Sequence, residues 1–253
     1  MRPRYFTKRY EAPERVASAA RHHAWLAEHA RPLRLPALTV VGPTSLTYEW
    51  VDGRPARPED LLALAALLGD AHGAAWITDL RPSSLNTPHR FRDGIAFGDY
   101  ISPRQTALRR RLEQGYLADR GALHAMLTLL EKTAEGPTAF YKDSNPRNFL
   151  ITEAGDIYTV DTDDLTLAPM GYDLAKLIAT MILTHGPLPA STIDSALRAY
   201  NEAAESHDRQ LGTTDRERLD DFLALHAVLT APYAGRNGYR CSWRPRSCPR
   251  GSA

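Results

Sequence analysis

Cysteine is nearly missing from this sequence. The two cysteines in 253 residues are Cys241 and Cys248, and both lie in an Arg-, Pro- and Gly-rich C-terminal segment. Two cysteines in a chain of this length do not make a disulfide framework, which excludes a small disulfide-stabilised fold. We therefore expect a reduced, cytoplasmic protein in which neither thiol has a structural role.

Excess charge and long apolar runs are missing too. The formal net charge is only +1, so we expect no general electrostatic attraction to nucleic acids or membranes. No apolar run approaches the roughly 18 residues that a transmembrane helix needs, and the N-terminus has no apolar signal-peptide core. The sequence thus predicts a soluble protein with neither a nucleic-acid nor a membrane partner.

Lysine is scarce, although basic residues are not. Of the 31 basic residues, only Lys8, Lys132, Lys142 and Lys176 are lysine. Arginine is the usual basic residue here, so each lysine marks a position worth inspecting. With 43% hydrophobic residues, the chain can bury a sizeable core in one large domain or two small lobes.

The most informative stretch is a polar loop followed by an acidic cluster. Asp143 and Asn148 lie in a loop between two apolar runs, and a third apolar run, residues 157–160, leads directly into Asp161. We interpret this pattern as strand, loop, strand, turn, strand and acid. It predicts that the three polar side chains meet at one end of a small sheet. Such oxygen ligands suit Mg²⁺, which is usually held by one or two carboxylates plus substrate phosphates.

The first 52 residues predict a small mixed lobe. We expect a strand over residues 4–10, a helix over 13–30 that opens at a proline, and a hairpin of strands 38–41 and 45–51. Three strands and one helix are too little to be stable alone, so this lobe must pack on the remainder of the chain.

The remaining sequence predicts a mainly helical lobe over residues 53–231 and a poorly ordered tail over 232–253. The expected helices cover residues 58–72, 100–114, 118–133, 172–184, 190–206 and 214–231, and residues 77–95 are expected to be loop. The polar loop with Asp143 falls within this helical lobe.

The polar loop and its flanking strands resemble the catalytic segment of protein-kinase-like phosphotransferases, nearest to the aminoglycoside phosphotransferase branch. Those proteins carry a His-x-Asp-x4-Asn loop, a metal-binding Asp after a nearby strand, and then Gly-x-x-x-Asp-Leu-Ala or a close variant. The corresponding segments here are Tyr141-Lys142-Asp143-x4-Asn148, Val160-Asp161 and Gly171-Tyr172-Asp173-Leu174-Ala175, in the same order and with matching gaps.

The resemblance implies an α+β, protein-kinase-like two-lobed fold and ATP and Mg²⁺ as cofactors. Asp143 would orient the hydroxyl of the acceptor, Asn148 and Asp161 would hold Mg²⁺, and Lys142 would neutralise charge on the transferred phosphate. Asp173 is expected to be architectural. Each catalytic residue also has a purely structural interpretation as a cap, turn residue or buried contact.

The resemblance extends more weakly into the first lobe. Lys8 falls where the family has a strand lysine that contacts phosphate. The segment Tyr48–Gly53 resembles the hinge strand, which implies that adenine contacts the carbonyl of Glu49 and the amide of Val51. The alternative for Lys8 is an exposed lysine on an edge strand.

The first lobe also departs from the family. The family begins with two strands bridged by a loop that covers the phosphates, whereas this sequence begins at the strand that corresponds to the third; an upstream translation start would supply the pair. The helix glutamate that should pair with Lys8 is absent from residues 18–24, and Tyr141 replaces the catalytic-loop histidine. The small N-lobe sheet is therefore expected to be incomplete.

Side chains around the loop have less specific interpretations. We expect Asp163 and Asp164 to be solvated turn acids, and His22 and His23 to be packing residues of the first helix. Arg147 either neutralises charge on the transferred phosphate or makes a structural contact.

Our first hypothesis is an ATP- and Mg²⁺-dependent phosphotransferase that acts on a hydroxyl of a small molecule, an aminoglycoside or another secondary metabolite. A cationic acceptor calls for an acidic face. Asp93, Asp99 and the cluster 161–164 are available, but Arg104 and the run 109–111 oppose them. This balance disfavours a strongly cationic acceptor.

Two alternatives stay open. The acceptor could be Ser or Thr of a biosynthetic precursor peptide, with a partner protein that completes the first lobe. The chain could also be a degenerate kinase-like binding or scaffold protein, because the phosphate-covering loop and the pairing glutamate are missing. The intact set of Asp143, Asn148 and Asp161 argues against decay of the site.

Overall fold

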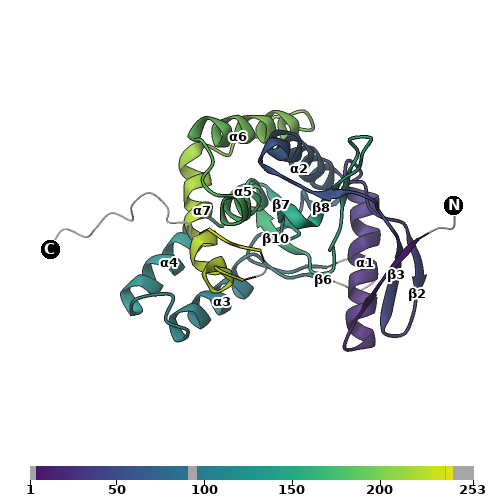
Figure 1. Ribbon diagram of the computed structural model, residues 1–253. Helices are drawn as coiled ribbons and strands as arrows, with labels where there is room; N and C mark the ends of the chain where they lie inside the picture. Colours follow the sequence, from purple (N-terminus) through teal and green to yellow (C-terminus); the bar gives the residue numbers. More distant parts are fainter. Residues whose placement is uncertain (1–3, 91–95, 237, 242–253) are drawn as a thin grey trace.

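The chain folds into a small sheet with one helix, joined to a larger helical body. The computed structural model describes residues 4–90, 96–236 and 238–241. In Figure 1 the sheet of β1, β2 and β3 and helix α1 lie on one side, and α2–α7 lie on the other. The predicted α+β architecture with a small N-terminal sheet is confirmed.

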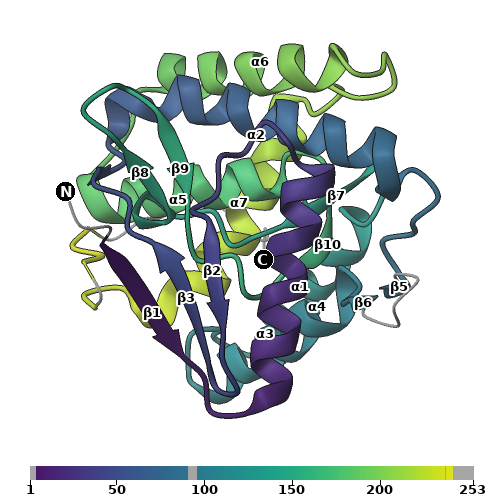
Figure 2. The same ribbon diagram turned by 90° about the vertical axis from the view of Figure 1, so that its right-hand side faces the viewer.

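The small sheet has the strand order β1-β3-β2. The antiparallel strands are β1 (Tyr5–Arg9), β2 (Leu38–Val41) and β3 (Ser45–Glu49). A tight turn joins β2 to β3, in which the Gly42 amide donates to the Ser45 carbonyl at 2.8 Å. Figure 2 shows the long helix α1 lying alongside this sheet.

Helix α1 (Pro13–His29) ties the small sheet to the body. Proline at its first turn suits a helix start, since its missing N–H would be unpaired there anyway. One part of the helix packs Val16 and Ala19 against Leu46 of the sheet. Further along, the Trp25 ring meets Phe97 of the body at 4.7 Å between centroids. The small lobe therefore depends on the body for its core, as its size predicts.

The helices of the body match their predicted positions closely. They are α2 (Leu61–Ala75), α3 (Ile101–Glu113), α4 (Arg120–Lys132), α5 (Tyr172–His185), α6 (Ala190–Glu205) and α7 (Arg216–Thr230). A 3₁₀ turn, Pro58–Asp60, precedes α2, and a π-helical turn, Trp76–Leu80, follows it. The predicted start of the loop at residue 77 is therefore wrong, because buried Trp76 and Leu80 prolong the helix into the core.

Helix α2 lies beside α6 in the body (Figure 1). The segment Pro58–Leu80 is long and apolar enough to cross a membrane by length and composition, which the sequence interpretation missed. Here it packs along α6, and Gly69 makes the contact possible, because a Cβ at this position would lie 2.1 Å from the Tyr200 carbonyl oxygen. Figure 1 shows the two helices side by side.

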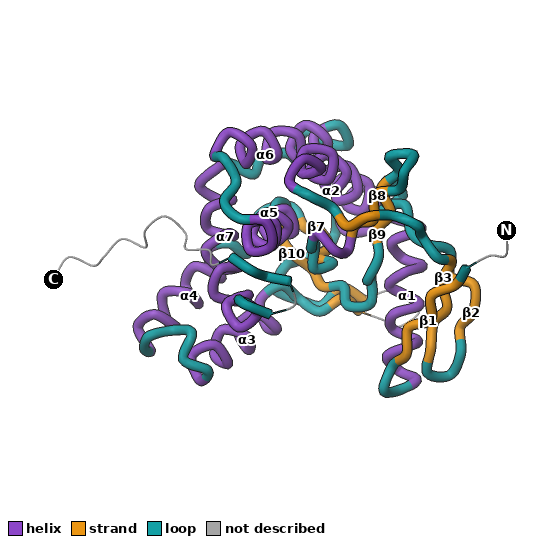
Figure 3. Tube along the Cα trace, in the orientation of Figure 1, coloured by secondary structure: helices purple, strands orange, loops and turns teal. Residues whose placement is uncertain are grey.

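The strands around the polar loop form two sheets instead of the one predicted. Strand β7 (Thr138–Tyr141) pairs with β10 (Thr166–Pro169), which the sequence interpretation missed. Strand β8 (Phe149–Ile151) pairs with β9 (Ile157–Thr159) and with β4 (Arg54–Pro55). A further pair joins β5 (His89–Arg90) and β6 (Ala96–Phe97). Figure 3 shows these short orange strands between the purple helices.

The first part of the C-terminal segment is ordered, contrary to expectation. Residues Ala231–Tyr233 form a 3₁₀ turn. The buried Tyr239 hydroxyl accepts a hydrogen bond from the Asn145 amide at 2.5 Å, and the Cys241 amide donates to the Leu183 carbonyl at 2.9 Å. The segment therefore packs on the polar loop. The rest of the predicted tail, residues 242–253 with Cys248, lies outside the described residues.

The contact between α2 and α6 yields a stability prediction. Gly69→Ala should lower the free energy of unfolding by about 1–3 kcal/mol, because the added methyl group has no room against the Tyr200 carbonyl. Gly121→Ala is the control on the exposed side of α4, where the new Cβ would lie 3.1 Å from Oδ1 of Asp119, the side chain that caps this helix. Because this exposed side chain can shift, we expect a change in stability of less than about 1 kcal/mol. Chemical denaturation measures both, and equal effects would contradict the packing argument.

Candidate active site

Two pockets meet at the polar loop. One, of about 520 Å³, is lined by Asp143 and by residues of α3, α5 and α7. The other, of about 480 Å³, lies between the small sheet and the β8–β9 hairpin. Arg147, Asn148 and Asp161 line both pockets. A group that passes from one pocket to the other would therefore pass these three side chains.

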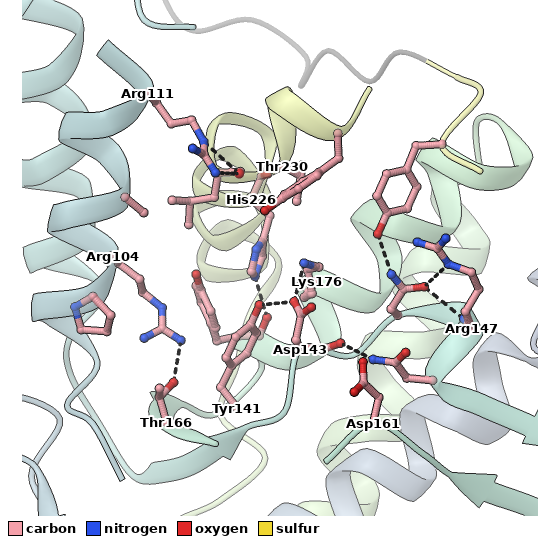
Figure 4. A pocket seen from close by; sticks show the side chains of 18 residues that line it. Arg104, Arg111, Tyr141, Asp143, Arg147, Asp161, Thr166, Lys176, His226 and Thr230 are labelled. Carbon is pink, nitrogen blue, oxygen red and sulfur yellow. Dashed lines mark hydrogen bonds and ion pairs between the residues drawn. The ribbon is translucent and has the colours of Figure 1, made fainter. Parts of the chain in front are cut away.

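Asp143 lies two residues after the end of β7 and lines the first pocket. Its backbone has φ 60°, in the left-handed region that few non-glycine residues adopt. Its side chain is 54% exposed, so a bound molecule can reach it. Oδ1 accepts the Tyr141 hydroxyl at 2.6 Å and the Lys176 ammonium at 2.5 Å. Figure 4 shows this cluster at the centre of the pocket.

The charge of Asp143 is fixed by its neighbours. Burial raises the pKa of its carboxyl, but the Lys176 charge and the hydrogen bonds from Lys176 and Tyr141 outweigh burial and lower the pKa to about 2. Asp143 is therefore an anion near neutral pH. Such a weak base can accept a hydrogen bond from a hydroxyl and orient it, which is the role that phosphoryl transfer requires.

Lys176 is the functional residue that the sequence interpretation missed. It lies on α5, one turn after Asp173, and its side chain is nearly buried beneath Asp143. Burial lowers the pKa of Lys176, but the charge of Asp143 and the hydrogen bond to it raise this pKa by more. The net pKa is therefore above its ordinary value, and the ammonium stays charged. The scarcity of lysine already marked this position, although nothing in the sequence showed what it contacts.

The β8–β9 hairpin brings Asn148 beside Asp161. The Val160 amide donates to the Asn148 carbonyl at 2.9 Å, which fixes the residue after Val160 next to Asn148. The Asn148 side-chain amide also donates to the Asp143 carbonyl at 3.1 Å. The structure thus brings the three predicted residues together, at the junction of two sheets.

Asp173 holds the polar loop in place. Its carboxylate is fully buried and accepts the Ser144 amide at 2.7 Å and the Ser144 hydroxyl at 2.8 Å. It also accepts the Lys142 amide at 3.3 Å. The predicted architectural role of Asp173 is confirmed, since these bonds satisfy the loop backbone around Asp143.

Lys142 does not lie where we expected. Its side chain is 1% exposed, and its Nζ lies 4.2 Å from the centroid of the Phe149 ring. The ammonium has no hydrogen-bond partner among the described residues, and Lys142 lines neither pocket. Burial lowers its pKa, and Asp173 opposes this. Lys142 is thus an interior counter-charge and cannot touch a phosphate from this position.

Lys8 lies in the second pocket, but its partner differs from the one the family implies. Its ammonium contacts Asp161 at 2.5 Å and Asp163 at 2.5 Å. Burial lowers the pKa of Lys8, and the two carboxylates raise it by more. The carboxylates that pair with Lys8 therefore come from the body and not from the first helix.

Asp163 is not the solvated acid that we predicted. Its side chain is 13% exposed, and it accepts the Tyr10 hydroxyl at 3.0 Å. The His22 ring, from the helix that lacks the glutamate, contacts the Asp163 carbonyl. Asp164 is exposed and pairs with Arg15, as expected.

The second pocket has a largely apolar lining that suits a flat ring. Glu49 and Val51 line it, together with Tyr48, Trp50 and Leu150. Both predicted hinge residues therefore line this pocket, and their contact with adenine stays a prediction. Lys8 and Asp161 lie in the same pocket, so a nucleotide with its ring against the hinge could direct its phosphates to these charged groups.

The first pocket is aromatic and basic instead of acidic. Tyr141, Tyr172, Tyr233 and Tyr239 line it. Asp99, which we counted toward an acidic face, instead caps the start of α3 through the Ser102 amide at 2.6 Å and is absent from the described lining. Asp93 lies outside the described residues.

The residues predicted to hold Mg²⁺ are Asn148 and Asp161. No group of three or more His, Cys, Asp or Glu side chains that could hold a metal occurs in residues 4–90, 96–236 and 238–241. Asp161 and Asn148 would supply one carboxylate and one amide oxygen where the pockets meet. This sparse set fits Mg²⁺, which takes its other ligands from phosphates and water.

The fold and this site define a protein-kinase-like phosphotransferase. The chain resembles an aminoglycoside-3'-phosphotransferase of type VIII, with 19% identity over 89% of this chain and 84% of that one and a TM-score of 0.57. The model of the phosphotransferase enzyme family (APH) matches residues 2–227. The chain therefore belongs to that family and is a phosphotransferase.

Two further structures share the fold. The choline kinase LicA from Streptococcus pneumoniae is 12% identical over 92% of this chain and 77% of its own, with a TM-score of 0.63. The amicoumacin kinase hAmiN, in complex with AMP-PNP and Ca²⁺, is 14% identical over 89% of this chain and 72% of its own, with a TM-score of 0.60. No curated protein sequence matches the chain significantly.

The Asp143–Lys176 pair predicts a pH effect. Because Lys176 lowers the pKa of Asp143, Lys176→Met should raise this pKa, shift the acid limb of the pH–activity profile upward and lower turnover by about tenfold or more. Lys132→Met, on the exposed surface, is the control and should leave the pH–activity profile unchanged.

The Asp143 carboxylate of the unchanged protein also affects stability. Because its pKa is below the ordinary value, it contributes stability that is complete above about pH 4 and is lost as the pH falls toward 2.

Lys142 should behave in the opposite way. Lys142→Met leaves the buried Asp173 without a nearby positive charge, so we expect a loss of about 1–3 kcal/mol of stability. Turnover per folded molecule should stay within a few-fold, because the ammonium does not reach either pocket. Denaturation curves and steady-state kinetics measure both. Loss of turnover without loss of stability would contradict this prediction and would indicate that Lys142 acts in the reaction.

Proposed function

We propose that the protein transfers the terminal phosphoryl group of ATP, with Mg²⁺, to a hydroxyl of a small molecule. The observation that carries this proposal is the meeting of the two pockets at Asn148, Asp161 and Arg147. One pocket presents a hinge strand and a lysine, and the other presents an ionised Asp143. Donor and acceptor would thus approach each other across the shared residues.

Each residue around the junction of the two pockets has its own role in the proposed transfer. The acceptor hydroxyl donates a hydrogen bond to Asp143, which orients its oxygen toward the donor phosphate. Lys8 and Arg147 provide positive charge on the donor side, where both line the second pocket. Mg²⁺ held by Asp161 and Asn148 would neutralise charge on the phosphates. Tyr141 and Lys176 keep the Asp143 carboxylate ionised and oriented.

The similar structures support a small acceptor and a nucleotide donor. Their names are those of an aminoglycoside phosphotransferase, a choline kinase and an amicoumacin kinase bound to AMP-PNP and Ca²⁺. The first pocket, at about 520 Å³, has the size of a small-molecule site. Nothing in the described residues favours the precursor peptide or the partner protein. The assembled Asp143, Asn148 and Asp161 argue against a scaffold without activity.

The proposal is tested first by nucleotide binding. Millimolar ATP with Mg²⁺ should raise the melting temperature by several degrees, because a ligand at about 100 times its Kd adds about 2.7 kcal/mol to the folded state. Asp161→Asn should abolish the Mg²⁺-dependent part of this shift. Asp164→Asn is the matched control, since Asp164 is exposed and lines neither pocket, and should keep the full shift. No shift with the unchanged protein would contradict ATP as donor.

A further inference from the structure

The charges around the acceptor pocket do not balance. Its charged side chains are Arg104, Arg111, Arg147, Lys176, Asp143 and Asp161. Asp143 pairs with Lys176, and Asp161 shares Lys8 with Asp163. Burial lowers the pKa of the neighbouring His226 well below its ordinary value, so this ring adds no charge near neutral pH. Neither carboxylate of this lining pairs with Arg104 or Arg111.

Arg104 is held by neutral groups. Its side chain is 6% exposed, and its guanidinium lies 4.5 Å from the Tyr172 ring centroid and 4.8 Å from that of Tyr141. It donates to the Tyr100 carbonyl at 2.8 Å and to the Thr166 hydroxyl at 3.3 Å. None of these partners carries a negative charge. The guanidinium is therefore stacked and oriented, while its charge stays uncompensated.

Arg111 is in the same situation two turns further along α3. Its side chain is 8% exposed, and Nε and Nη2 donate to the Leu229 carbonyl at 3.1 and 2.9 Å. Nη1 donates to the Gln114 side chain at 2.9 Å. Among the residues that the structure describes, no carboxylate lies within ion-pair distance of Arg104 or Arg111. Nothing in the described fold neutralises either guanidinium.

Two buried guanidinium groups without counter-charges have a cost that a ligand can offset. A buried charge is unfavourable unless it is paired, and arginine suits the planar oxygens of carboxylates and phosphates. Residues seven apart on a helix lie on the same side, about 10 Å from each other along its axis. Figure 4 shows Arg104 and Arg111 on α3, across the pocket from Arg147.

We propose that the acceptor is a hydroxyl compound that carries an anionic oxygen group, a carboxylate or a phosphate, and that this group binds on the α3 side of the pocket against Arg104 and Arg111. The inference rests on the proposed function and names the class of its acceptor. The hydroxyl then lies at Asp143 and the anionic group lies toward α3. A polycationic acceptor would instead meet these arginines, with both carboxylates already paired.

Acceptors that differ only in charge test the inference directly. One series is glucuronate, glucuronamide and 6-amino-6-deoxyglucose, and a second is glycerate, glyceramide and 3-amino-1,2-propanediol. Calorimetry in the presence of Mg²⁺ and a non-hydrolysable ATP analogue measures binding, and ADP release with ATP measures transfer. In at least one series, we expect the carboxylate to bind about tenfold or more tightly than the amide, and the amine to bind most weakly.

A pair of variants on α3 locates the effect. Arg111→Met should remove most of the preference for the carboxylate over the amide, measured as the ratio of their two dissociation constants in the same variant. Arg109→Met is the matched control, because Arg109 is exposed on the same helix and outside the lining, and should keep the preference. Arg111 also holds the Leu229 carbonyl, so Arg111→Lys, which keeps the charge, is the second variant and should keep the preference.

The outcomes separate this inference from the proposed function. If Mg²⁺ and ATP do not raise the melting temperature of the unchanged protein, the proposed function fails. If they do, and neither carboxylate binds more tightly than its amide or an amine binds best, the inference about the acceptor is overturned. An equal loss of preference in Arg109→Met and Arg111→Met would also overturn it, since the effect would then come from general surface charge.

Discussion

The ion pair between Lys176 and Asp143 is the interaction on which the site depends. Lys176 comes from a buried helix and Asp143 from a strained loop position, and their contact at 2.5 Å keeps the carboxylate ionised in spite of its surroundings. The same contact uses up one of the two negative charges of the acceptor pocket. The ionisation of Asp143 and the net charge of the first pocket therefore both depend on this ion pair.

A second charged cluster lies in the pocket that we propose for the nucleotide. Lys8 bridges Asp161 and Asp163, and these bonds join the small sheet to the acidic turn of the body. A kinase-like lobe without the helix glutamate thus still holds its lysine, because Asp163 supplies a carboxylate from the opposite side. Between the two pairs lies Asn148, which is bonded to the Asp143 carbonyl. The two pockets are consequently parts of one connected network.

Much of the fold could be predicted from the sequence, and so could the central trio of the site. The helices α4 and α6 are clearly amphipathic, and the order of Asp143, Asn148 and Asp161 marks the polar loop. The position of Lys142 could not be predicted, since a residue next to Asp143 in sequence can face either side of the loop. Strand β10 was missed, because four residues after an acidic turn have no distinctive pattern of their own.

By itself, the sequence determined the polar loop with Asp143, Asn148 and Asp161 and most of the helices, because local spacing and periodicity encode them, and its resemblance to known phosphotransferases indicated the family and the two-lobed fold. Only the tertiary structure decided which charges face each other. Lys176, Asp163, Arg104 and Arg111 acquire their roles from partners far away in the chain, and burial changes what each charge costs. Charge pairing across the core depends on three-dimensional packing. Only the folded protein therefore shows that the lining of the first pocket is basic.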